Sequence, residues 1–173
     1  MRKLILLTVF AACATLTAFS QTQYEISRDP KNGEKILKGL ISRDLLTQDT
    51  AFKWYAENLT GYKANAAALE GFKKHKDSVQ VLVFMGTWCE DSHSVIPKFF
   101  TLMDEAQVPL NHITLFGVNR QKESVGQLSA ALGITNVPTI IILKNGKELG
   151  RVVEYGKFGL FDMDLGEILK GIQ

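Results

Sequence analysis

The sequence predicts an α/β protein whose central mixed β-sheet has helices on both faces. From residue 79 onward, short apolar runs typical of buried strands alternate with amphipathic segments, and this alternation favours a parallel βαβ unit. Further along, Asn145-Gly146 lies between two strand-like segments and is a strong hairpin signal, which adds antiparallel strands. With 173 residues, of which 46% are hydrophobic, the chain is long enough to bury one core.

The first twenty residues have the pattern of a secretory signal peptide. A short basic start is followed by an apolar stretch over 4–14 and by small residues that favour cleavage before Gln21. The apolar stretch is too short for a transmembrane helix, so none is expected in the mature chain. We therefore expect an exported protein, located in the periplasm. As an alternative, residues 10–13 weakly resemble a lipoprotein cleavage motif, which would leave the protein lipid-anchored through Cys13.

Removal of the leader leaves a chain that is formally neutral and has one thiol. Residues 1–20 contain Arg2 and Lys3 and no acidic residue, so 18 Lys and Arg remain against 18 Asp and Glu. The neutral chain lacks the excess of basic residues that would suggest a nucleic-acid partner. Cys13 is lost with the leader, and Cys89 cannot form an internal disulfide. Such a thiol is either buried and inert or reactive towards other molecules.

The elements before residue 63 are expected to form a helical extension. Residues 21–31 are polar and predict a loose lead-in. Over 34–46 the apolar residues recur at helical spacing, which predicts a helix. Residues 50–59 contain three aromatic side chains and predict a short helix or turn that packs them on the core. The chain is thus divided into an N-terminal helical extension over 21–62 and a main domain over 63–173.

The elements of the main domain follow from two patterns. Runs of β-branched and large apolar residues predict strands, and apolar residues at helical spacing predict helices. In chain order we expect helix 65–76, strand 79–85, helix 94–106, strand 112–118, helix 125–132, strand 139–143, strand 148–154 and helix 162–172.

Three features near the first of these strands carry a family resemblance. The turn after the strand reads Trp88-Cys89-x-x-Ser92, Pro97 follows in the next helix, and Val137-Pro138 precedes a later strand. The chain resembles the thioredoxin family, and in particular exported bacterial thioredoxin-like proteins, whose W-C-x-x-C motif it departs from at the last position. The resemblance implies a thioredoxin-like fold over about residue 65 to the end.

The resemblance also implies a cis peptide bond before Pro138. In that geometry the Val137 backbone would face Cys89 and offer an extended substrate a short edge for strand-like pairing. Trp88, Val137 and Pro138 are accordingly the expected substrate-binding residues.

The chemistry of the turn follows from its position at the start of a helix. Unpaired N–H groups and the helix dipole there favour the thiolate of Cys89, the nucleophile in disulfide exchange. Ser92, one helical turn on, can donate a hydrogen bond to the thiolate but cannot release a substrate from it. Glu90 and Asp91 suit a first helical turn, yet their charge opposes thiolate formation. Val83 stands where many thioredoxins have a buried carboxylate that moves protons.

These residues predict a monothiol thiol–disulfide oxidoreductase or isomerase, with Cys89 and Ser92 as its catalytic pair. Its partners would be thiol- or disulfide-containing proteins or small thiols, and an external thiol would resolve the mixed disulfide. The alternative is a redox-inactive binding module that holds a partner peptide in the cis-proline groove. No cofactor is expected, and the histidines lack the spacing of a metal site. His93, close to the thiol, is expected to be an exposed surface residue.

Overall fold

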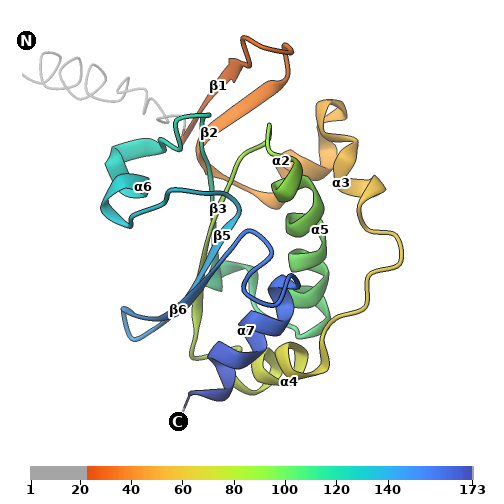
Figure 1. Ribbon diagram of the computed structural model, residues 1–173, viewed down its shortest axis with the longest axis vertical. Coiled ribbons are helices and arrows are strands. Elements are labelled where there is room, and N and C mark those ends of the chain that lie inside the picture. The colour runs from red at the N-terminus through yellow and green to blue at the C-terminus, as the bar shows by residue number, and fades with distance from the viewer. Residues whose placement is uncertain (1–22, 173) are drawn as a thin grey trace, which may run out of the picture.

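The computed structural model describes residues 23–172 and contains a six-stranded mixed sheet (Figure 1). The strand order is β1-β2-β4-β3-β5-β6, with β3 and β4 parallel and every other neighbouring pair antiparallel. The strands are β1 (Tyr24–Arg28), β2 (Lys35–Ile41), β3 (Gln80–Met85), β4 (Ile113–Gly117), β5 (Thr139–Lys144) and β6 (Lys147–Val153). The predicted α/β class and mixed sheet are confirmed.

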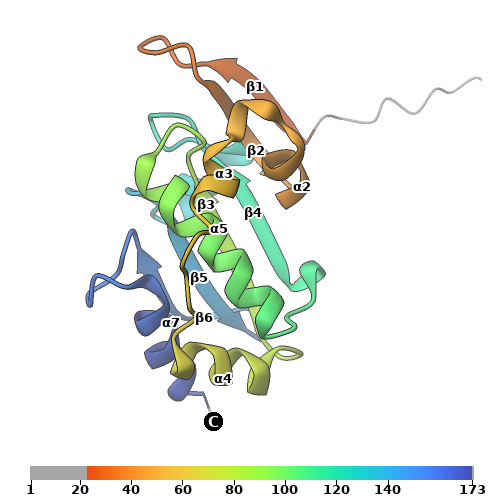
Figure 2. The same cartoon turned by 90° about the vertical axis from the view of Figure 1, so that its right-hand side faces the viewer.

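Helices cover both faces of the sheet, as expected. Figure 2 shows the long helix α5 lying along one face, and α6 lies on the other side. The α-helices are α2 (Arg43–Gln48), α3 (Trp54–Glu57), α4 (Ala66–His75), α5 (Glu90–Glu105), α6 (Leu128–Ala131) and α7 (Phe161–Lys170). Short 3-10 turns are η1 (Thr50–Phe52), η2 (Leu110–His112) and η3 (Val125–Gln127). Within residues 23–172, no helix combines the length and the apolar character that a membrane crossing requires.

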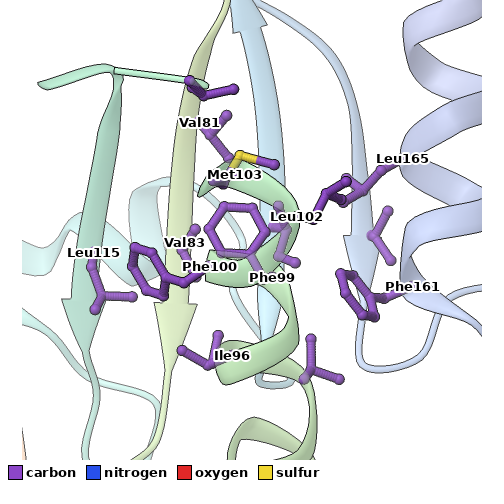
Figure 3. Close-up of a cluster of buried hydrophobic side chains, with 14 of the residues drawn as sticks. Val81, Val83, Ile96, Phe99, Phe100, Leu102, Met103, Leu115, Phe161 and Leu165 are labelled. Carbon is purple, nitrogen blue, oxygen red and sulfur yellow. The ribbon is translucent and has the colours of Figure 1, made fainter. Parts of the chain in front are cut away.

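The alternation of side chains along β3 explains the two-sided core. Val81, Val83 and Met85 point into the larger cluster, and Figure 3 shows Val81 and Val83 facing the apolar side of α5. Phe84 points the other way and stacks on Phe116 of β4 in the smaller cluster under α6. A strand with period-two side chains can be apolar throughout only when both faces are covered.

The N-terminal extension is not a helical appendage. The predicted helix over 34–46 is wrong in its first part, which is strand β2, and the expected loose lead-in contains β1. Strand β2 is interior to the sheet, between β1 and β4, and Leu37 and Ile41 belong to the larger core cluster. The helical expectation holds only for the later part of 21–62, in α2, η1 and α3.

Other boundaries differ in smaller ways. The hairpin at Asn145-Gly146 is confirmed, and both residues have positive φ, as its two-residue turn requires. The predicted helix over 125–132 is interrupted, because Gly126 and Gln127 within η3 are left-handed and regular α-helix begins only at Leu128. Helix α5 begins at Glu90, four residues before the predicted start, and therefore directly after Cys89.

Candidate functional site

Cys89 is the N-cap residue of α5, at the point where the chain leaves β3 and enters the helix. A tight turn forms this junction: Cys89 N–H donates to Gly86 O at 3.0 Å, and His93 N–H donates to Cys89 O at 2.9 Å. The thiol is half-buried and is the free cysteine of the described chain. It thus lies at the positive end of a 16-residue helix, where a thiolate is stabilised.

The predicted cis peptide bond between Val137 and Pro138 is confirmed, and so is its orientation. The Cys89 thiol donates a hydrogen bond to Val137 O, with Sγ and O 3.2 Å apart. The carbonyl of Pro138 is already engaged, because it accepts from Glu154 N–H at 2.7 Å in the segment that follows β6. The backbone group beside the thiol is therefore the carbonyl of Val137, a residue that is itself buried.

Ser92 follows Cys89 by three positions in the sequence, but its hydroxyl is bonded to the backbone rather than to the thiol. Its side chain is fully buried, and Oγ accepts a hydrogen bond from Gly86 N–H at 3.2 Å. Within the described part of the chain, no hydrogen bond joins Ser92 Oγ to Cys89 Sγ. The hydroxyl ties the end of β3 to the first turn of α5 and so holds the turn that carries Cys89.

Trp88 is held in place by contacts on its edge and its face. Its indole Nε1–H donates to Val118 O at 2.8 Å, while the guanidinium of Arg120 lies 4.8 Å from the ring centroid. Arg120 in turn forms an ion pair with Asp29, a carboxylate whose side chain is fully buried at the end of β1. Gly86 makes room for the indole, since a Cβ there would lie 2.7 Å from Trp88 Cε2.

The N-terminal extension also contacts the helix that carries the thiol. His93, expected on the surface, is half-buried and stacks on Trp54 of α3, with centroids 4.2 Å apart. Its Nε2 lies 2.7 Å from Thr87 O and donates to it, because a carbonyl only accepts. The sequence contained no signal for this pair, since the two rings are far apart along the chain.

Glu90 and Asp91 occupy the first turn of α5, as predicted, and only Asp91 has a neighbour near the thiol. Glu90 is exposed, whereas Asp91 is half-buried beside Tyr155. Burial raises the pKa of Tyr155, and the charges of Asp91 and Cys89 raise it further, while a hydrogen bond with Ser94 lowers it. Tyr155 is thus a site residue that the sequence analysis missed.

The remaining predictions concern charge and metals. Val83, at the position where many thioredoxins have a carboxylate that moves protons, is fully buried in the larger core cluster. Among residues 23–172, no group of three or more histidine, cysteine or acidic side chains is arranged to hold a metal ion. The Nδ1 of His112 forms a hydrogen bond with the backbone oxygen of Val79, and the two atoms are 3.1 Å apart.

Comparison with known proteins points to one family. The family model described as Thioredoxin matches residues 63–159, more than half of the chain. A thioredoxin of Echinococcus granulosus is 29% identical over 97 residues, which cover 56% of this chain and 80% of that protein. Thioredoxin-like protein R548 of Acanthamoeba polyphaga mimivirus is 25% identical over 80 residues, 46% of this chain and 56% of that protein. The chain thus aligns with little more than half of the viral protein's length.

Among solved structures, an HIV epitope-scaffold protein has a similar fold. Its TM-score is 0.51 at 17% sequence identity, and the alignment covers 74% of this chain and 90% of the scaffold. At this identity the likeness concerns the fold alone. The matched segment of the family model begins after the N-terminal extension and includes both Cys89 and Pro138.

Proposed function

The chain belongs to the thioredoxin family, and we propose that it performs thiol–disulfide exchange through the single thiol of Cys89. One observation carries the proposal: the half-buried thiol belongs to the N-cap residue of α5 and faces Val137 O beside the cis-proline. That position combines a helix N-terminus, which favours the thiolate, with a backbone edge that an extended substrate can pair with.

The exchange begins when the Cys89 thiol loses its proton to solvent and its hydrogen bond to Val137 O. The thiolate attacks one sulfur of a substrate disulfide; a bond forms between Sγ and that sulfur, and the substrate S–S bond breaks. The other substrate sulfur leaves as a thiolate and takes up a proton. Val137 O, released by the cysteine, is then free to accept from a backbone N–H of the substrate.

An external thiol is required to complete the cycle. The mature chain proposed here has no second cysteine, and serine occupies the position of the usual resolving thiol. The mixed disulfide therefore persists until a thiolate of another molecule attacks the substrate sulfur and restores Cys89. Proteins and small thiols are the proposed partners. We further propose that the protein acts in the cell envelope, on the strength of the leader pattern at residues 1–20, which lie outside the described residues.

The reactivity of Cys89 towards two reagents tests the proposal. We expect iodoacetamide to alkylate Cys89 at least about tenfold faster at neutral pH than it alkylates a free cysteine, because the helix N-terminus favours the thiolate. Glutathione disulfide should form a mixed disulfide that mass spectrometry detects in the wild type and not in Cys89→Ser. Ser92→Cys is the matched gain-of-function control and should confer insulin reduction.

The opposite result would favour a redox-inactive binding module. In that case Cys89 would react no faster than a free cysteine, and glutathione disulfide would leave the protein unchanged. Partner proteins would then be recovered equally on the wild type and on Cys89→Ser, whether or not a reductant is present.

A further inference from the structure

We infer that the substrate of Cys89 is a polypeptide segment with an apolar residue about two positions, and an acidic residue about four positions, from its reacting cysteine. These two residues would occupy a groove that runs from Tyr155 along α5 to Lys98. The inference rests on the proposed function and names the substrate class of the same site.

The groove is a cavity of about 430 Å³ beside the first half of α5. This volume lies in the range of small ligand sites. Figure 2 shows the linker after α3 passing over α5 towards α4, and Figure 1 shows the segment between β6 and α7 beside the same helix. The lining residues that matter here are Tyr62, Val95, Lys98, Tyr155, Leu160 and Phe161.

The groove lies close to the thiol site, and Tyr155 is the residue between them. Tyr155 lines it and also lies beside Asp91 and within the electrostatic influence of Cys89. The residue before it, Glu154, donates its N–H to the carbonyl of the cis-proline. A substrate chain that pairs with Val137 thus meets Tyr155 next and then the groove.

Apolar and basic side chains face the groove. Leu160 is 56% exposed at its rim, so its apolar side chain is available for contact with an occupant. Lys63 and Lys98 also line it, and neither forms an ion pair with any described residue.

The one acidic residue that lines the groove is already bonded. Asp162 accepts from the hydroxyl of Tyr62 and from the N–H of Asn65, both at 2.9 Å. Burial and the hydrogen bond to Asp162 raise the pKa of Tyr62, so its hydroxyl keeps its proton and remains the donor. Since Asp91 stands at the Cys89 end, an acidic substrate residue is favoured at the far end, beside Lys98.

The spacing along α5 sets the positions in the substrate. Ser94 and Lys98 follow Cys89 by five and nine residues, about 7.5 and 13.5 Å along a helix that rises 1.5 Å per residue. An extended chain rises about 3.3 Å per residue, so its second and fourth residues from the cysteine reach these levels. Residues two apart in an extended chain also share a face. A tripeptide thiol is too short to reach Lys98.

Peptide disulfides of chosen sequence test the inference. The probes are Cys-Ala-Phe-Ala-Asp, its reverse Asp-Ala-Phe-Ala-Cys and the control Cys-Ala-Gly-Ala-Lys, each as a mixed disulfide with thionitrobenzoate. Thionitrobenzoate is the better leaving group, so attack by Cys89 releases its coloured thiolate. We expect one of the two acidic peptides to react about tenfold faster than the control peptide.

Variants assign the effect to the groove. Lys98→Glu should abolish the preference for the acidic peptide, and Leu160→Ser should reduce the rate about threefold or more. Because Leu160 is exposed, its replacement should leave the folded core intact. The matched controls are Lys74→Glu on α4 and Leu110→Ser, an equally exposed leucine in η2, and neither should change the preference.

The outcomes separate this inference from the proposed function. Equal rates for all three peptides, with release of thionitrobenzoate still dependent on Cys89, would overturn the inference alone. A preference unchanged in Lys98→Glu and Leu160→Ser would do the same. If Cys89 reacted with no peptide and not with glutathione disulfide, the proposed function would fail, and this inference with it.

Discussion

At the scale of single residues, Cys89 and Ser92 have different surroundings. Cys89 faces Val137 O, whereas Ser92 is turned to the backbone of Gly86 and is fully buried. In the sequence the two looked like a catalytic pair. In the structure Ser92 has a supporting role. Among the described residues, the one hydrogen-bond partner of its hydroxyl is the N–H group of Gly86.

The first prediction distinguishes these two roles of Ser92. Ser92→Ala leaves the buried N–H of Gly86 without an acceptor, which should lower the free energy of unfolding by about 1–3 kcal/mol. The alkylation rate of Cys89 should stay within about twofold. Denaturant unfolding and iodoacetamide kinetics measure the two effects.

Ser78→Ala is the control for that experiment. Its hydroxyl is on an exposed residue and donates to His75 O, so the loss should be below about 0.5 kcal/mol. A large fall in the alkylation rate of Ser92→Ala, without loss of stability, would instead show that the hydroxyl serves the thiolate.

At the scale of elements, β2 supports the turn that carries the thiol. The Thr87 hydroxyl donates to Lys35 O at 2.9 Å and accepts from Leu37 N–H at 3.2 Å. One buried side chain thereby joins the strand of the N-terminal extension to the residue two positions before Cys89. The extension is thus part of the scaffold of the site, although the matched segment of the family model begins after it.

The second prediction concerns this bridge. Thr87→Val keeps the shape but removes both hydrogen bonds, which leaves Leu37 N–H buried without an acceptor; we expect a loss of about 1–3 kcal/mol in unfolding free energy. Thr87→Ser retains the hydroxyl and should lose clearly less. Denaturant unfolding of the three proteins checks this, and equal losses in both variants would contradict it.

At the scale of the whole molecule, ion pairs join segments that are distant along the chain. Asp29 and Arg120 connect the end of β1 to the segment after β4, and Lys35 and Asp49 connect β2 to the start of η1. The N–H of Lys31 and then Arg120 lower the pKa of Asp29 below its ordinary value of 3.8. A hydrogen bond from Lys35, and then one from Ala51 N–H, do the same for Asp49.

The third prediction is the acid dependence of stability. Because the folded pKa values lie below the unfolded ones, the unfolded state binds more protons at low pH. The stability from these groups is complete above their ordinary value of 3.8 and is lost as the pH falls through the folded values. Unfolding in denaturant at a series of pH values measures it. In Asp29→Asn the decline should be shallower, and stability that rises with acidity would contradict the prediction.

Sequence patterns alone were sufficient for the elements whose periodicity is local. Apart from the interrupted helix over 125–132, the strands and helices expected from residue 65 onward were predicted and confirmed, with shifts at their ends. The hairpin at Asn145-Gly146, the position of Cys89 and the orientation of Val137 before a cis-proline were confirmed as well. In each case the signal lies within a few residues, or in a motif that the chain shares with a family whose model it matches.

The prediction failed where a segment's conformation depends on its neighbours in space. The apolar residues of 34–46 fit one face of a helix, but they fit equally a strand buried on both faces. Strand β2 is favoured because β1 and β4 satisfy its backbone groups from either side.

The surroundings of the thiol depended on the tertiary structure for the same reason. The partner of Ser92, the Trp54–His93 stack and the position of Tyr155 depend on contacts between segments that no local pattern relates. Asp29 and Arg120, 91 positions apart, are the clearest example. Hydrogen bonds and ion pairs between such segments form only when the sheet brings them together. The position of Cys89 at the start of a helix was therefore evident from the sequence, whereas its surroundings were decided by packing.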